Sequence, residues 1–189
     1  MDRRIGDDVR AWVDKNELEE LVAVLSSAVD RGDRERIISC YDTDSYDDHG
    51  TFKGSGTEFA DFVCGRASMS AMHHLLGQSV FHVEGDEAWG ETFFSFHGAA
   101  GGGVVSGYGR YVDYFRRAGG TWKLKYRRVV PDAVPTGDDL AAYSSATRDR
   151  TDPSYDRRRS PEDVDPRSED VDPTPEDEDA DGKSGLANS

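Results

Sequence analysis

Apolar residues recur with two different periods along the chain, helical near its start and alternating later. The stretch 17–29 carries a single apolar stripe at the 3.6-residue period, formed by Leu18, Leu21, Val22, Leu25 and Val29. Asn16 is placed to cap this helix, and Asp33 to cap a second short helix that contains Ile37, Ile38 and Tyr41. A third short helix is predicted over 57–64.

Four later segments alternate between apolar and polar residues, as half-buried strands do. They span 72–83, 88–97, 104–117 and 121–130, and polar or glycine-rich turns separate them. A shorter strand and turn are predicted over 45–56. Helices followed by an antiparallel meander of strands indicate an α+β fold, in which the helices pack on one face of a curved sheet.

The end of the chain differs in composition from the rest. Residues 151–189 hold 13 acidic and five basic residues, and their one aromatic residue is a tyrosine. A seven-residue unit, Ser-Pro-Glu-Asp-Val-Asp-Pro at 160–166, recurs in altered form at 167–173 and 174–180. Sequence of this kind buries too little apolar surface to offset its ordering entropy. We therefore predict a folded domain over residues 1–136 and a disordered acidic tail over 137–189.

Charge and composition exclude several classes of function. A net charge of −15 and a pI near 4.6 argue against a nucleic-acid partner, which requires a basic surface. No run of 18 apolar residues would span a membrane, and the first residues lack the apolar core of a signal peptide. Cys40 and Cys64 are too few for a disulfide framework. The sequence therefore predicts a cytoplasmic protein with reduced thiols.

The sequence lacks the usual motifs for metals and cofactors. The five histidines form no helical His-x-x-x-His pair, and the acids at 42, 44, 47 and 48 lack the glycine and terminal glutamate of a calcium loop. No glycine-rich phosphate loop precedes a helix, and there is no nucleophile elbow. We expect neither a cofactor nor a metal.

Three groups of residues together resemble a known family. They are Ala28-Val29-Asp30-Arg31-Gly32-Asp33, His74-Leu75-Leu76-Gly77-Gln78 with Gly85-Asp86-Glu87-Ala88, and Gly109 to Arg117 with Trp122-Lys123-Leu124. Their order over about residues 14–133 resembles the SnoaL-like branch of the nuclear transport factor 2-like superfamily, which includes scytalone dehydratase and hexachlorocyclohexane dehydrochlorinase. The resemblance implies a cone-shaped α+β barrel, in which a curved antiparallel sheet wraps over three N-terminal helices. The cone would enclose a cavity for a small apolar molecule.

The resemblance also implies a catalytic pair. In lyases of this superfamily an aspartate at the end of the first long helix orients a histidine on the next long strand, and Asp30 and His74 hold the matching positions. Such a carboxylate fixes the tautomer of the imidazole and stabilises its protonated form. Strand alternation alone does not distinguish His74 from His73, and His74 is preferred for its spacing to Gln78, where relatives often carry asparagine. The structural alternative makes Asp30 a helix terminator and His74 a hydrogen-bonded core residue.

Further site residues follow from the same resemblance. Arg127 matches an arginine that lies near the leaving group in dehydrochlorinase-type relatives, although a solvated basic stripe with Lys123 and Lys125 is an equally good interpretation. The residues expected to line the cavity are Leu25, Tyr46, Trp89, Phe93, Tyr108 and Tyr111. Leu25 stands where several dehydratases carry a tyrosine, so Tyr46 or Tyr111 would have to supply that hydroxyl.

Two functions of different classes remain. The first is a cofactor-independent lyase or isomerase, in which an Asp-assisted histidine removes a proton from a small apolar ring compound of the polyketide, steroid or terpenoid type. The second is a non-catalytic ligand-binding, accessory or oligomerisation module that resembles the small subunit of a dioxygenase. By analogy, the open face of the sheet is expected to pack against copies of the chain in a homodimer or homotrimer.

Overall fold

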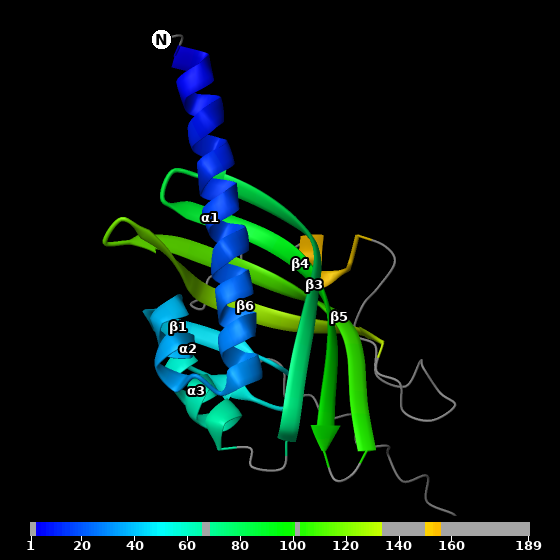
Figure 1. Ribbon diagram of the computed structural model, residues 1–189. Helices are drawn as coiled ribbons and strands as arrows, with labels where there is room; N and C mark the ends of the chain where they lie inside the picture. Colours follow the sequence, from blue (N-terminus) through cyan, green and yellow to red (C-terminus); the bar gives the residue numbers. More distant parts are fainter. Residues whose placement is uncertain (1–2, 66–68, 101–102, 134–149, 156–189) are drawn as a thin grey trace, which may run out of the picture.

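The apolar stripe of the first helix and the alternating strands meet in one hydrophobic core. The computed structural model describes residues 3–65, 69–100, 103–133 and 150–155. Its elements in chain order are α1 (Arg3–Arg31), α2 (Arg34–Cys40), β1 (Tyr41–Asp48), β2 (Lys53–Gly54), α3 (Gly56–Cys64), β3 (Met69–Glu84), β4 (Glu87–Ala100), β5 (Gly103–Ala118), β6 (Thr121–Ala133) and the 3-10 turn η1 (Pro153–Tyr155). Over the described ranges the strands form one curved sheet in the order β2-β1-β6-β5-β4-β3 (Figure 1).

The sheet is mixed and does not close on itself. β3, β4, β5 and β6 form the antiparallel meander that the sequence predicts, and neighbouring strands pair along nearly their whole length. β1 joins β6 in parallel, and β2 extends that edge through an antiparallel pair with β1. The prediction of a cone-shaped α+β fold is confirmed, with the correction that one of its strand pairs is parallel.

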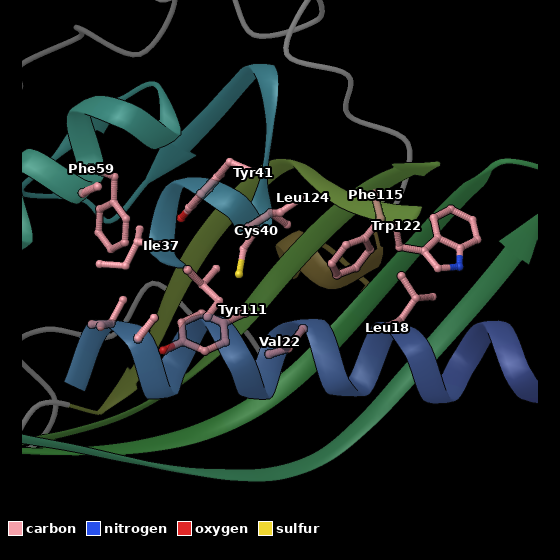
Figure 2. Packing of buried hydrophobic residues seen from close by; sticks show 14 of the residues in the cluster. Leu18, Val22, Ile37, Cys40, Tyr41, Phe59, Tyr111, Phe115, Trp122 and Leu124 are labelled. Carbon is pink, nitrogen blue, oxygen red and sulfur yellow. The ribbon is translucent and has the colours of Figure 1, made fainter. Parts of the chain in front are cut away.

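Helix α1 is longer than the predicted helix over 17–29. Its C-terminal half buries Leu18, Val22 and Leu25 against the concave face of the sheet, where Figure 2 shows Leu18 and Val22 near the inward-facing aromatic rings of β5 and β6. Its N-terminal part projects beyond the sheet in Figure 1, and Trp12 on it is 70% exposed. The apolar stripe therefore marks the buried half of the helix only, and Asn16 lies inside the helix rather than at its cap.

The two short helices close one end of the concave face. Asp33 caps α2 as predicted, since its carboxylate accepts a hydrogen bond from the backbone of Arg36. Tyr41, predicted within that helix, instead begins β1, and its ring packs edge-on against Phe59 of α3. Ser55 and Glu58 form a capping box that starts α3. α1 packs along β3 and α2, which places the end of α1 beside the edge strand of the sheet.

Part of the predicted tail is attached to the domain. The segment 150–155 lies beside the sheet, and Asp152 is only 3% exposed because its carboxylate binds the guanidinium of Arg110 on β5. These six residues belong to the part of the chain that the sequence analysis assigns to the tail. The seven-residue repeats lie outside the described residues. Among the helices that the structure describes, none has both the length and the apolar composition needed to cross a membrane.

Candidate functional site

Asp30 and His74 meet at the junction of α1 and β3. Gly32, with a positive φ of 61°, ends the helix just beyond Asp30. Oδ1 of Asp30 lies 2.5 Å from Nδ1 of His74, and Oδ2 accepts a hydrogen bond of 2.9 Å from the backbone N–H of the same residue. One carboxylate thus holds both the ring and the backbone of His74.

A groove of about 520 Å³ runs beside this pair. One wall is α1 and the other is β3, and the lining residues are Ala23, Ser26, Ser27, Asp30, Arg31, Met72, His73, His74 and Leu76. His74 is half-buried and shares its side of the strand with Met72 and Leu76, which pack against the core, whereas His73 is exposed. The structure therefore turns His74, and not His73, toward the concave face.

Two aromatic rings lie close to His74. Its ring centroid lies 5.0 Å from that of Phe96 and 6.1 Å from that of Phe94, both on β4. Burial lowers the pKa of His74 below its ordinary value, and the Asp30 carboxylate opposes this fall. The imidazole is therefore neutral near pH 7, the form that accepts a proton.

Arg127 lies deep in the concave face rather than in a solvated stripe. Its guanidinium donates to both oxygens of Asp113, at 2.8 and 2.7 Å, and stands 3.8 Å over the ring of Tyr111. Burial opposes its charge, but Asp113, Tyr41 and Tyr111 together outweigh burial and raise the pKa of Arg127 above its ordinary value. Arg127 is thus a fixed positive charge, and its direct bonds go to Asp113.

The residues expected to line the cavity divide between the two faces of the sheet. Tyr111 is buried on the concave face, and Leu25 belongs to the core. The remaining four, Tyr46, Trp89, Phe93 and Tyr108, occupy the alternating positions that face the other way. Tyr46 stacks on Tyr126, Trp89 packs near His82 and Tyr114, Phe93 lies under Arg110, and Tyr108 is exposed. Period-two alternation separates these two sets, but it does not say which face is concave.

The structure adds a cluster at the end of β1 that the sequence did not point to. Asp47 is fully buried and bonds the hydroxyl of Tyr41 through one oxygen and Nδ1 of His49 through the other. The neighbouring acids face elsewhere, because Asp42 pairs with Arg116 and Asp44 with Lys125. The run of acids in this strand is therefore a set of separate contacts. The available signal in the sequence was the spacing of Asp47, near the end of β1, and His49, just beyond that strand.

Metal ligation has no support in the described ranges, since no three side chains of His, Cys, Asp or Glu come together there in a way that would hold an ion. The site is instead an imidazole held by a carboxylate, beside a groove and against aromatic rings. Such an arrangement accepts and returns protons.

The sequence matches a family model over most of its folded part. The model describes the SnoaL-like domain and matches residues 10–128. No protein in a search of curated proteins matches the chain.

Solved structures of the same fold are numerous, and three serve as examples. A candidate scytalone dehydratase of Novosphingobium aromaticivorans superposes with a TM-score of 0.65 at 16% identity, over 74% of this chain and 97% of that one. LinA superposes with a TM-score of 0.63 at 17% identity, over 71% of this chain and 97% of the LinA chain. Kfla4162 of Kribbella flavida superposes with a TM-score of 0.62 at 15% identity, over 67% of this chain and 95% of that one. At these identities the similarity establishes the fold.

Proposed function

The chain belongs to the SnoaL-like domain family, and from this premise we propose that it is a cofactor-independent lyase or isomerase in which His74 is the general base. The observation that carries the proposal is the bond of 2.5 Å between Nδ1 of His74 and the Asp30 carboxylate, at the wall of a groove. The substrate class is a small, largely apolar ring compound, since the rings of Phe94 and Phe96 lie beside the imidazole.

The chemistry begins with removal of a proton from carbon by Nε2 of His74. Asp30 orients the ring and stabilises the imidazolium that forms. The fixed charge of Arg127 and the hydroxyl of Tyr111, on the same face of the sheet, would stabilise negative charge that develops on the substrate. Tyr111 is then the tyrosine that replaces the missing hydroxyl at Leu25. The names of two neighbours, a candidate scytalone dehydratase and a hexachlorocyclohexane dehydrochlorinase, support an elimination.

The test is a panel of ring compounds followed for elimination by absorbance and for exchange of acidic C–H protons with deuterium by NMR. Scytalone, hexachlorocyclohexane and cyclic β-hydroxy ketones make up the panel. We expect His74→Gln to lower the rate on any active compound by about 100-fold or more, the usual contribution of a general base. His82→Gln is the matched control, since His82 pairs with Glu84 on the same strand but is 57% exposed. Equal rates for the wild type and His74→Gln would contradict the proposal.

Association of copies is a second proposed role, and the convex face of the sheet favours it. Apolar side chains stand exposed there, namely Leu75, Val80, Val104 and Tyr108. We expect sedimentation velocity to detect a dimer or trimer that Val104→Asp converts to monomer. A wild-type protein that sediments as a monomer would contradict this role.

A further inference from the structure

A second imidazole–carboxylate pair lies at the end of β1. Nδ1 of His49 is bonded to Oδ1 of Asp47, and Oδ2 of the same carboxylate accepts a hydrogen bond from the hydroxyl of Tyr41. The His49 ring stacks on Phe59 of α3, with ring centroids 4.4 Å apart. Within the described residues, His49 makes its side-chain hydrogen bond through Nδ1, as His74 does. In both rings Nδ1 is therefore bonded to a carboxylate, and Nε2 is the other nitrogen at which the ring can exchange a proton.

The two pairs belong to one continuous surface inside the cone. Arg127 of β6 is in register with Asp47, and its guanidinium lies 3.8 Å from the ring centroid of Tyr111. Tyr111 stacks on Phe94 at 4.3 Å, and the Phe94 ring is 6.1 Å from that of His74. Contacts across the concave face therefore lead from one imidazole–carboxylate pair to the other, with no change of face.

The two imidazoles can take different parts in one elimination. Arg127 is committed to Asp113 through two hydrogen bonds. The carboxylate of the fully buried Asp47 is bonded to His49 and to the hydroxyl of Tyr41. Burial lowers the pKa of His74, which favours the neutral ring that accepts a proton. Loss of water requires an acid as well as a base, and His49 is the second imidazole that the described residues place on this surface.

We propose that His49 is the general acid of the elimination, which protonates an oxygen leaving group while His74 removes the proton from carbon. This role rests on the proposed function and adds to it a second residue that transfers a proton.

The step balances without a co-reactant. The C–H bond next to the carbonyl breaks, its proton goes to Nε2 of His74, and its electron pair forms the new C=C bond. The C–O bond at the β-carbon breaks with its electron pair on oxygen, which takes the proton from Nε2 of His49 and leaves as water. The products are an α,β-unsaturated carbonyl compound and water. Exchange of protons with solvent then returns His74 to the neutral form and His49 to the protonated form.

The test compares two probes that differ only in the leaving group. 3-Hydroxycyclohexanone and 3-chlorocyclohexanone both give 2-cyclohexenone. The formation of this product is followed by its ultraviolet absorbance, and the rate without protein is subtracted. Chloride leaves without a proton, so only the hydroxyl probe needs a general acid. His49→Gln keeps an amide that can donate to Asp47, and His82→Gln is the control at an exposed imidazole–carboxylate pair.

We expect His49→Gln to lower kcat/KM for the hydroxyl probe by about 100-fold or more and for the chloride probe by less than about 3-fold. His74→Gln should lower both, and His82→Gln neither. An equal effect of His49→Gln on both probes, or no effect on the hydroxyl probe, overturns the role of His49 while the proposed function stands. A wild-type protein that converts neither probe, and does not exchange their C–H protons, counts against the proposed function itself.

A measurement on the wild-type protein keeps the inference testable if His49→Gln fails to fold. Titration with 2-cyclohexenone should shift the ring NMR signals of both His49 and His74, because both imidazoles face one ligand. A shift at His74 alone shows that they do not, and overturns the role of His49. Shifts at neither ring overturn that role as well.

Discussion

At the residue scale, two opposing effects set the ionisation of His74. Burial lowers its pKa, and the hydrogen bond and charge of Asp30 raise it. Replacing Asp30 by asparagine removes the second effect and leaves the first. We expect Asp30→Asn to lower the pKa of His74 further, as followed by the NMR shift of its Cε1 proton against pH. An unchanged or higher midpoint would show that Asp30 does not stabilise the imidazolium.

The lowered pKa of His74 also makes the stability of the folded protein depend on pH. Because its folded pKa lies below the unfolded value of about 6.5, the unfolded chain binds more protons between the two values. Above the unfolded pKa the ring is neutral in both the folded and the unfolded chain, so His74 adds no pH dependence there. As the pH falls below that value, the unfolded chain binds the proton more readily and the folded state loses stability. We expect the Tm of the wild type, relative to His74→Gln, to fall between pH 7.5 and 5.5 in thermal melts. Parallel Tm curves for the two proteins would contradict this.

Whether a site residue can be predicted from the sequence depends on how far along the chain its partner lies and on what buries the pair. Asp30 and His74 are 44 positions apart, and it is the family resemblance, not a local pattern, that singles them out. His49 is two residues from Asp47, yet what makes the pair notable is the complete burial of Asp47. That burial depends on strands and helices from distant parts of the chain. Local spacing contains no information about it.

At the scale of elements, the packing of β4 against β3 depends on a residue without a side chain. A Cβ at Gly90 would lie 2.1 Å from the ring of Phe81, which is buried in the core. We expect Gly90→Ala to lower the free energy of unfolding by about 1–3 kcal/mol, the usual cost of overpacking, in urea denaturation.

The matched control for this substitution is Gly107 on the neighbouring strand β5. A Cβ there meets nothing within 4 Å. We expect Gly107→Ala to leave stability unchanged or raise it by about 0.5 kcal/mol, since alanine loses less entropy than glycine on folding. Similar losses in the two variants would mean that the contact with Phe81 is not the cause of the loss at Gly90.

The elements that the sequence predicted best are those whose pattern is set by burial on one face. The four long strands and the buried half of α1 show their periodicity because one side of each meets the core. The parallel pairing of β1 with β6 has no such local signature, since a pattern of alternation does not name its partner strand. The exposed N-terminal part of α1 lacks a buried face, so its helix was not foreseen.

At the scale of the whole molecule, one buried arginine connects the end of the described chain to the sheet. Arg110 donates to Asp152 at 2.8 and 2.9 Å and to Glu91 and Asp132 at 3.0 Å. Composition alone assigned this segment to the disordered tail, because a single buried aspartate among many acids has no signature of its own. Val130, which pairs with Arg110 across the two strands, is fully buried as well.

The attachment of segment 150–155 can be tested by limited proteolysis. Asp152→Asn keeps the shape of the side chain and removes the charge that Arg110 binds, while Glu91 and Asp132 still hold that guanidinium. A loss of about 1–2 kcal/mol in local stability raises the fraction of molecules in which the segment is detached from the sheet roughly 5- to 30-fold. Trypsin cleavage after the exposed Arg150 should accelerate by the same factor. Asp61→Asn, which breaks an exposed ion pair with Arg34, should leave the rate unchanged. Equal cleavage of wild type and Asp152→Asn would mean that the bond to Arg110 does not hold the segment on the sheet, and the domain would then end at β6.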